Sequence, residues 1–411
     1  MNETVTIEKL VHGGQGLATM ADGRRVFVWN ALPGETVVIR VIKKKRSYAE
    51  AIAEEIITPS SERKQPLDSN YLATSPWQIL PLSAEDRYKA EIVEELFAHE
   101  HIKLPSFSVT SGKEWRYRNK MEYSFWGDES GLHLALHERG SHGKQIVQGS
   151  SLAMTAVDAG AQAILVELQK LSDLRAGDLK TVIVRASQDG NAVAALFVKK
   201  EDFPVPDLPT TLKGLKIYYS NPKSPASVPT KLLHQIGNTS LVDTILGHSL
   251  VYDAVGFFQV NIPVFEQALT IIKQAVGDRQ SIDMYSGVGS IGIPLGSRAL
   301  IELDPSNVAM AQKNTSDSEV ILASSETALD YITGDDVVIV DPPRAGLHRA
   351  VVDKLLSAQP PKICYLSCNP ATQARDIALL QEAYRIKIFQ VFNFFPHTPH
   401  IETLAILERK N

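Results

Sequence analysis

The sequence predicts an α/β protein whose C-terminal part is a doubly wound, mostly parallel sheet that ends in an antiparallel hairpin. Three observations predict this class. Short apolar strands alternate with helical segments from about residue 250 onward, which is typical of a parallel sheet covered by helices. Residues 5–57 alternate apolar and polar residues between glycine-containing turns, which predicts a small OB-like β-barrel. The stretch between these parts is rich in strand-like segments, which predicts a central β-rich domain.

Composition limits the function classes. A chain of 411 residues exceeds the size of one core, so two to three domains are expected. Hydrophobic content of 44% and charged content of 22% are ordinary for a globular protein, and we expect no membrane contact because no apolar run is long enough to span a bilayer. The net charge of −5 argues against a coat of nucleic acid but allows local basic patches. The N-terminal residues lack a signal segment and the two cysteines suit a reducing compartment, so we expect a cytoplasmic protein.

The first basic patch follows the predicted barrel strand at 37–42. Lys43, Lys44 and Lys45 form it together with Arg46. The simplest interpretation is a solvated hairpin end. On a small barrel, however, such a block also suits RNA, because lysine and arginine bind phosphates.

The middle of the chain begins with a helix. Apolar residues at spacings of three and four predict it at 84–102. An antiparallel domain is expected after it, with a stiff proline loop at 204–209. Its strand-like segments are 118–125, 181–185, 192–198 and 215–219. The later strands of the parallel sheet are expected near 281–285, 299–303, 319–322, 336–340, 361–366, 385–394 and 401–408. The last two have no room for a helix between them and must form an antiparallel hairpin at one edge.

A glycine-rich loop follows the strand at 281–285. Gly287 and Gly289 allow a tight turn and leave space for a ligand beside a helix N-terminus. The next strand ends in Glu302, which is placed to accept hydrogen bonds from ribose hydroxyls. Glu302 could instead be a helix-capping charge. The loop and the acid together predict a nucleoside cofactor.

Three further groups are candidates for catalysis. Asp341 and Arg344 flank two prolines at the end of a buried strand, which holds both side chains in one geometry. Cys368 follows another strand, and with Cys364 as the other cysteine the chain has neither a zinc pattern nor a disulfide framework. Cys368 is therefore a candidate nucleophile, and Glu402 near the end is a candidate proton acceptor.

Taken together, these motifs resemble those of the S-adenosylmethionine-dependent RNA uracil-C5 methyltransferases, of the type with an N-terminal TRAM domain that acts on 23S rRNA. The resemblance covers nearly the whole chain. It is carried by GGQGLA at 13–18, YRNK at 117–120, FFQVN at 257–261, DMYSGVGS at 283–290, DPPR at 341–344, SCNP at 367–370 and FPHTPHIE at 395–402.

The resemblance implies a class I methyltransferase fold beside a central β-rich domain and a TRAM barrel. The implied domains are a TRAM RNA-binding barrel at 1–58, a central RNA-binding domain at 59–78 and 111–249, and a methyltransferase domain at 79–110 and 250–411. S-adenosylmethionine is the implied cofactor, and its implied contacts are Gln259, Tyr285, Gly287, Ser290, Glu302 and Asp341. Ser290 stands where some members have a cofactor-binding asparagine. Cys368 is the implied nucleophile and Glu402 the implied base. The residues expected to contact RNA are Arg118, Asn119, Lys120, Phe258, Arg344, Lys43, Lys44 and Lys45.

One departure from the family is informative. Many members hold an iron–sulfur cluster on four cysteines, three before the helix at 84–102 and one after the HERGSHGK segment. The matching stretches here, 66–78 and 147–152, contain no cysteine. Because such clusters are bound by thiolates, we expect neither a cluster nor another metal.

The chemistry that these residues suggest is covalent. A thiolate adds to uracil C6, C5 is methylated, and a base then removes the C5 proton from a flipped-out nucleotide. Ribosomal RNA is the expected substrate, transfer RNA is the alternative, and a monomer is expected. Two other functions remain open. A nitrogen-directed methyltransferase would not need Cys368, and a non-catalytic RNA-binding or RNA-folding protein would bind the cofactor without methylating RNA.

Overall fold

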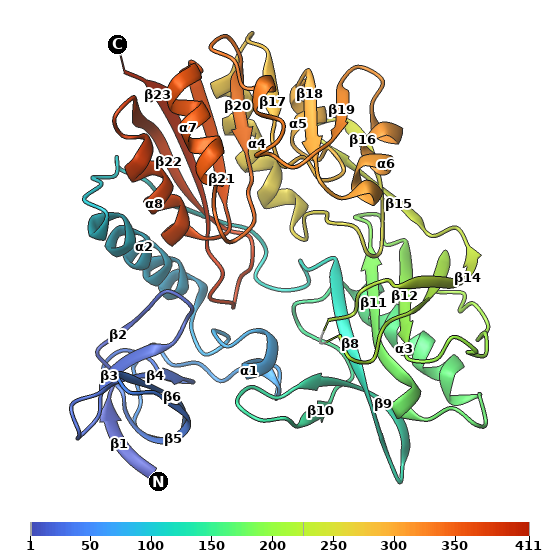
Figure 1. Ribbon diagram of the computed structural model, residues 1–411. Coiled ribbons are helices and arrows are strands. Elements are labelled where there is room, and N and C mark those ends of the chain that lie inside the picture. Colours follow the sequence, from blue (N-terminus) through green and yellow to red (C-terminus); the bar gives the residue numbers. More distant parts are fainter. Residues whose placement is uncertain (1, 225, 411) are drawn as a thin grey trace.

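The computed structural model describes residues 2–224 and 226–410, and the strands of these residues form four sheets (Figure 1). The N-terminal sheet has six strands in the order β1-β5-β6-β4-β3-β2. Their bounds are β1 Asn2–Thr6, β2 Lys9–Leu10, β3 Gly16–Thr19, β4 Arg25–Trp29, β5 Thr36–Lys44 and β6 Tyr48–Thr58. The two edge strands, β1 and β2, are consecutive in the chain, so the sheet curls to bring its edges toward each other. Among the described residues no ladder joins β1 to β2 or β3, so the expected closed barrel is here a curved sheet.

The central sheet has seven strands in the order β10-β9-β8-β11-β12-β13-β14. Their bounds are β8 Lys120–Asp128, β9 Gly131–His137, β10 Lys144–Ile146, β11 Leu179–Ala186, β12 Ala192–Val198, β13 Gly214–Tyr219 and β14 Lys231–Gly237. The expectation of a purely antiparallel sheet is wrong at one place, because β12 and β13 pair in parallel across the proline loop. Sequence analysis also missed helix α3 (Thr155–Gln169), which covers one face of this sheet. A short 3-10 turn, η1 (Ala176–Asp178), precedes β11.

A two-stranded antiparallel sheet connects the central sheet to the C-terminal one. It consists of β15 (Ser240–Ile245) and β16 (His248–Asp253). Its apolar residues pack with helix α4 (Ile262–Val276) in one core. This core also includes residues of the central sheet, so the two large sheets share buried apolar surface.

The C-terminal sheet has eight strands in the order β19-β18-β17-β20-β21-β23-β22-β7. Their bounds are β7 Val109–Ser111, β17 Ser281–Asp283, β18 Ala299–Glu302, β19 Glu319–Leu322, β20 Val337–Val340, β21 Lys362–Ser367, β22 Tyr384–Asn393 and β23 Glu402–Arg409. The doubly wound sheet and its antiparallel terminal hairpin are confirmed. The hairpin is not the outer edge, because β7 pairs with β22 beyond it.

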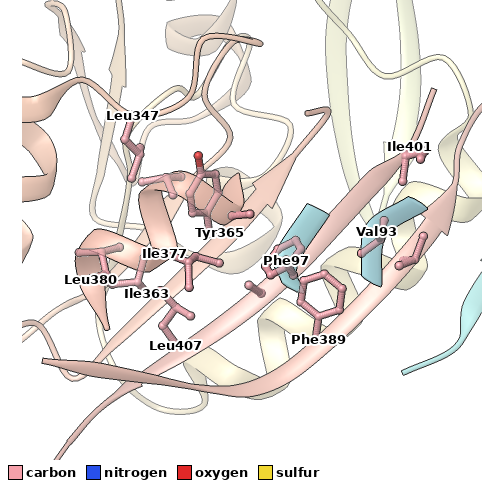
Figure 2. Packing of buried hydrophobic residues seen from close by; sticks show 14 of the residues in the cluster. Val93, Phe97, Leu347, Ile363, Tyr365, Ile377, Leu380, Phe389, Ile401 and Leu407 are labelled. Carbon is pink, nitrogen blue, oxygen red and sulfur yellow. The ribbon is translucent and has the colours of Figure 1, made fainter. Parts of the chain in front are cut away.

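Helices cover both faces of this sheet. These helices include α2 Leu82–His99, α5 Gly292–Leu295, α6 Pro305–Asn314, α7 Arg349–Ala358 and α8 Pro370–Leu380, with a 3-10 turn η2 at Leu329–Tyr331. The short helix α1 (Tyr71–Thr74) lies in the segment before α2. Helices α2, α7 and α8 share one core, and α4 lies on the other face. Figure 2 shows Val93 and Phe97 of α2 packed near Phe389 of β22, and the Phe97 and Phe389 ring centroids are 4.9 Å apart. A helix encoded before the central domain is thus part of the C-terminal core.

Among the described residues, no helix is both long enough and apolar enough to cross a membrane.

Candidate active site

The carboxyl ends of four neighbouring strands bring the candidate residues together. The parallel pairing of β17 with β18 and β20, and of β20 with β21, places the ends of these strands at one edge of the sheet. The residues at or just beyond this edge are Tyr285 after β17, Glu302 at the end of β18, Asp341 after β20 and Cys368 after β21. Open α/β sheets bind ligands at this edge.

The terminal hairpin adds Glu402 to this edge. Strand β21 pairs with β23 in an antiparallel register in which Ser367 is opposite Thr403. Cys368 directly follows Ser367, and Glu402 directly precedes Thr403, so both residues lie at the end of this ladder. Directly opposed residues of an antiparallel pair have Cβ atoms about 5 Å apart. The thiol and the carboxylate are therefore neighbours although 33 residues separate them in the sequence.

Burial controls the protonation of both groups. It raises the pKa of Cys368 to about 12, to which the negative charges of Glu402 and Asp341 contribute while Arg344 opposes. The pKa of Glu402 is also raised well above its ordinary value, by burial and by Asp341, against the positive charges of Arg344 and Lys89. Burial alone raises the pKa of Asp341 to about 7. These raised pKa values favour the protonated forms of the thiol and both carboxyl groups. The Cys368 thiol must therefore lose its proton before a thiolate can form.

Helix α8 begins directly after Cys368. Asn369 caps this helix by accepting a hydrogen bond from the Ala371 amide at 3.2 Å, and Pro370 occupies the first turn. The Asn369 amide also donates to the Arg344 carbonyl oxygen at 2.8 Å, which joins the two loops of the site. The amino end of a helix favours a negative charge, so this position assists thiolate formation.

The glycine-rich loop is shaped for a ligand. Gly287 and Gly289 have φ values of 56° and 88°, which favour glycine. The Glu302 carboxylate accepts a hydrogen bond from the Gly287 amide at 2.8 Å and so fixes the loop. Beside it, Asp283 Oδ1 and Ser286 Oγ are buried without a hydrogen-bond partner, and burial raises the pKa of Asp283 to about 8. Unpaired buried polar atoms beside a glycine loop fit a polar ligand such as a nucleoside.

The loop that leads into β23, residues 394–401, is called here the terminal loop. Buried side chains of α2 hold its start and its middle. Lys89 Nζ lies 2.8 Å from Glu85 Oε1 and donates to Asn393 Oδ1 at 2.7 Å, and Glu85 Oε2 accepts from the His397 amide at 2.8 Å. The Tyr117 hydroxyl donates to the Pro396 carbonyl oxygen at 3.0 Å. The terminal loop therefore enters β23 from a fixed position, immediately before Glu402.

The N-terminal sheet also contacts the terminal loop. A Cβ atom added to Gly14 would lie 2.2 Å from Pro399 Cβ, so only glycine fits this contact. Trp77 Nε1 donates to the Gly14 carbonyl oxygen at 3.0 Å. The turn that contains Gly14 thus lies against the loop that leads to Glu402.

The expected RNA contacts lie in different environments. Arg118 is half-buried, with its guanidinium 5.9 Å from the centre of the Phe395 ring in the terminal loop. Asn119 is fully buried and donates to the Gln259 carbonyl oxygen at 3.0 Å, so it supports the backbone of a candidate cofactor contact. Lys120 donates to the Val255 carbonyl oxygen at 3.4 Å, and burial lowers its pKa to about 7.

The two neighbouring phenylalanines at 257 and 258 differ in exposure. Phe258 is buried and stacks on Tyr252 with the ring centroids 3.9 Å apart, so its ring does not face solvent. Phe257 is 58% exposed, and a Cβ added to Gly287 would lie 3.8 Å from its ring. Phe257 therefore borders the glycine loop. Sequence analysis did not select it, and alternation along an extended segment is the signal that could have separated the pair.

Seven other candidates complete the set. Gln259 and Ser290 are buried and Tyr285 is half-buried. Lys43 pairs with Glu50 at 3.1 Å, whereas Lys44 and Lys45 are exposed at the end of β5. Arg344 is exposed and its Nη2 lies 3.1 Å from His400 Nδ1.

Hydrogen bonds connect the two stretches that would carry cluster ligands in other members. The Asp68 carboxylate accepts bonds from the Ser151 amide at 3.1 Å and from Gln78 Nε2 at 2.9 Å. The side-chain oxygen Oε1 of Gln78 in turn accepts from the Leu67 and Asp68 backbone amides at 3.0 and 3.1 Å. Across residues 2–224 and 226–410, no group of three or more His, Cys, Asp or Glu side chains is arranged to hold a metal.

Two family models match segments of this chain. The family model for tRNA (uracil-5-)-methyltransferase matches residues 327–410, which include Asp341, Cys368 and Glu402. The TRAM domain model matches residues 2–53. The chain is similar to the RNA (uracil-5-)-methyltransferases in its C-terminal part and to TRAM domains in its N-terminal part. It is thus related to S-adenosylmethionine-dependent enzymes that modify RNA.

Full-length relatives support the same assignment. The methyltransferase is 27% identical to an uncharacterised RNA methyltransferase of Nitratidesulfovibrio vulgaris, covering 100% of this chain and 96% of the relative. It is 29% identical to an uncharacterised RNA methyltransferase of Enterococcus faecalis, covering 99% and 98%. The structure of Pyrococcus abyssi tRNA (uracil-54, C5)-methyltransferase in complex with S-adenosyl-L-homocysteine has a TM-score of 0.81 at 23% identity, covering 99% of this chain and 100% of that one. The fold of the methyltransferase is therefore shared over its whole length.

Proposed function

We propose that the methyltransferase makes 5-methyluridine in RNA by a covalent mechanism on Cys368 and Glu402. The observation that carries this proposal is the register of β21 and β23. Ser367 is opposite Thr403, so the adjacent Cys368 and Glu402 lie at the end of one ladder, at the edge where Asp341 and the glycine loop also lie. A nucleophile and a base must act on adjacent carbon atoms, C6 and C5 of one ring. Two side chains at the end of one ladder are close enough to act on adjacent atoms of one base.

The cofactor site lies beside these residues. Gly287 and Glu302 form a fixed loop, and the unpaired Asp283 Oδ1 and Ser286 Oγ are ready to bind polar groups. When bound there, S-adenosylmethionine supplies the methyl group that uracil C5 accepts. Gln259, Tyr285, Ser290 and Asp341 complete the proposed contacts, and the exposed ring of Phe257 borders the same loop.

Cys368 carries out the first step. Its thiol loses a proton, and the thiolate forms a bond to uracil C6 while the C5–C6 π electrons move onto C5 and O4. The resulting nucleophilic C5 is the atom that is methylated. Burial and two acids raise the pKa of Cys368 to about 12, which disfavours the thiolate, and the nearby Arg344 opposes this shift. Its positive charge stabilises the thiolate.

Glu402 completes the reaction. After methylation C5 bears both a proton and the new methyl group, and the Glu402 carboxylate takes the proton. The electrons of the C–H bond restore the C5–C6 double bond, and the S–C6 bond breaks to release the Cys368 thiolate. The raised pKa of Glu402 suits a base that must bind a proton from carbon.

We infer that 23S rRNA is the substrate, because a TRAM domain, a central β-rich domain and this catalytic domain occur together in the large-subunit rRNA enzymes that the sequence resembles. Transfer RNA is the second candidate. It is favoured by the family model, which bears the name of a tRNA enzyme, and by the Pyrococcus abyssi enzyme, whose printed title names tRNA uracil-54.

The experiment compares both RNAs directly. The purified protein is incubated with S-adenosylmethionine and with either 23S rRNA or tRNA from a strain that lacks the gene, and 5-methyluridine is measured by nucleoside mass spectrometry. We expect 5-methyluridine in the rRNA. Methylation of tRNA alone would assign the second substrate, and a methylated nucleoside other than 5-methyluridine would refute the proposed chemistry.

A matched pair of cysteine variants tests the mechanism. Cys368→Ala should lose methyl transfer while calorimetry still detects binding of S-adenosylmethionine. Cys364→Ala should remain active, because Cys364 is fully buried within β21 and lies away from the strand end. Appreciable turnover by the Cys368 variant would rule out the covalent route.

A further inference from the structure

Three lysines of the central sheet line one cavity of about 490 Å³. Lys144, Lys180 and Lys199 each donate to a backbone carbonyl oxygen, those of Phe125 at 3.1 Å, Ala226 at 2.6 Å and Gly177 at 3.1 Å. Within residues 2–224 and 226–410, none of the three forms an ion pair. Their ammonium groups are thus oriented without being neutralised.

Other polar groups complete the wall of this cavity. The hydroxyls of Ser124, Thr181 and Ser227 line it, together with His137. Glu122 also lines it and is its one acidic residue. With three lysines, one glutamate and a neutral histidine, the lining carries a net charge of about +2 at neutral pH. Ammonium and hydroxyl donors around a positive cavity are the groups that bind phosphate oxygens.

Strand register shows which face of the central sheet bears the cavity. Ser124 of β8 is opposite Thr181 of β11, and Lys144 of β10 is opposite His137 of β9. These residues lie on one face, because Met121, Tyr123 and Phe125 alternate with them and pack in the core under α3. The cavity therefore opens on the face away from α3.

The same face leads to the candidate active site. Along β8 it continues from Ser124 through Glu122 to Lys120, and the chain then reaches Arg118 beside the terminal loop. Six residues of extended chain span about 20 Å. The cavity therefore lies about 20 Å along the chain from Arg118, a distance that several nucleotides of RNA span.

We propose that this cavity binds a backbone phosphate of the substrate RNA, several nucleotides from the methylated uridine. The inference rests on the proposed function, because it takes the RNA as ligand and Cys368 as the reacting position. It assigns an anchoring role to Lys144, Lys180 and Lys199, none of which is in the basic block at Lys43–Lys45. Such a contact fixes the register of the RNA without reading its sequence.

The test uses a triple variant with a matched control. The variant carries Lys144→Gln, Lys180→Gln and Lys199→Gln. The control carries Lys170→Gln, Lys273→Gln and Lys313→Gln, three exposed lysines near the ends of α3, α4 and α6. Both proteins lose the same charge, so a general electrostatic effect would appear in both.

Binding is measured by fluorescence anisotropy at several salt concentrations, with a 30-nucleotide RNA centred on the target uridine and a 5-nucleotide RNA that is too short to reach the cavity. We expect the triple variant to bind the long RNA about tenfold more weakly than the control. The slope of log affinity against log salt should fall by about 0.7 for each lost phosphate contact. The short RNA should bind the two proteins equally. Equal affinity for the long RNA, or an equal loss with the short RNA, would overturn the inference.

A second measurement does not depend on the folding of the triple variant. The wild-type protein is acetylated with a small amine reagent, with and without the long RNA, and the modified lysines are identified by mass spectrometry. RNA should protect Lys144, Lys180 and Lys199, and lack of protection would refute the site. Methylation of the long RNA by the wild-type protein tests the proposed function separately. Suppose that 5-methyluridine forms, but RNA does not protect the three lysines and the triple variant has the same salt slope as the control. The phosphate site would then be refuted, and the proposed function would stand.

Discussion

The buried ion pair on α2 gives the sharpest prediction. Lys89 and Glu85 are both fully buried, with Lys89 Nζ 2.8 Å from Glu85 Oε1. Lys89→Met keeps most of the volume of the side chain but leaves the Glu85 carboxylate in the core without its counter-ion. Breaking a buried pair in this way costs about 3–5 kcal/mol of folding free energy. The loss should be larger than the Asn393 hydrogen bond alone would cause, about 1 kcal/mol.

Chemical denaturation at pH 7, followed by tryptophan fluorescence, measures this cost. Lys89→Met should shift the transition to lower denaturant, and the double variant Glu85→Gln/Lys89→Met should recover part of the loss because no charge is then buried alone. Glu91→Gln is the matched control, since this residue of the same helix has a largely exposed side chain. A Lys89→Met protein as stable as wild type, or a double variant less stable than the single one, would contradict the assignment of a buried ion pair.

The same change should alter catalysis through Glu402. Asp341, Arg344 and Lys89 are the charges that act on this carboxylate, and the positive charge of Lys89 lowers its pKa. Removing Lys89 raises the pKa of Glu402, so a higher pH is needed to form the carboxylate that removes the C5 proton. The pH at half-maximal turnover should therefore move upward in Lys89→Met. If Lys89→Met only loosened the terminal loop, turnover would fall by the same factor at every pH.

Four further outcomes follow from the site. Glu402→Gln should accumulate a covalent, methylated protein–RNA adduct that survives denaturing electrophoresis and is absent when Cys368 is also replaced; normal multiple turnover would remove Glu402 from the mechanism. Arg344→Ala should move the pH dependence of adduct formation upward, because the Arg344 charge lowers the pKa of Cys368 and of Glu402, whereas Arg344→Lys should keep the wild-type profile; an unchanged profile in Arg344→Ala would exclude this role. Asp283 has a pKa raised from 3.8 to about 8, so its contribution to stability declines as the pH rises across this interval. The stabilising effect of Asp283→Asn on the cofactor-free protein should therefore grow from about pH 4 to about pH 8 and then level off, and a melting-temperature difference that is constant with pH would contradict the raised pKa. Protein purified without oxygen should be colourless and contain no stoichiometric iron by elemental analysis, and one cluster per chain would refute this expectation.

The sequence predicts the C-terminal sheet well because its strands are short, apolar and separated by clear helices. It does not predict α3, although Val157, Ala161 and Ile164 have helical spacing, because the small residues between them weaken the pattern against the strands on both sides. It also does not show that β12 and β13 are parallel, since parallel pairing depends on how the proline loop crosses the sheet.

Within the candidate site, the sequence selects Cys368 and Glu402 as candidates but does not show that the two lie at the end of one strand ladder. That relation depends on the register of β21 and β23, which packing of the whole hairpin determines. The exposure of a side chain is a second property that the sequence does not show. Phe258 and Phe257 are identical as residues, and only the fold shows that the first is in the core and the second borders the glycine loop. Lys89 pairs with Glu85, four residues earlier in the same helix, and that spacing is visible in the sequence. Its hydrogen bond to Asn393 joins residues 304 positions apart, and the sequence does not show it.

This long separation has a consequence for synthesis of the chain. At about 5–20 residues per second, a ribosome needs roughly 15–60 s to translate the segment between Lys89 and Asn393. During this time α2 has left the ribosome, but β22 and β23, against which it packs, have not been made. The apolar face that carries Val93 and Phe97 is therefore exposed in every nascent chain. We expect the newborn protein to depend on chaperones that hold this helix until the last strands emerge.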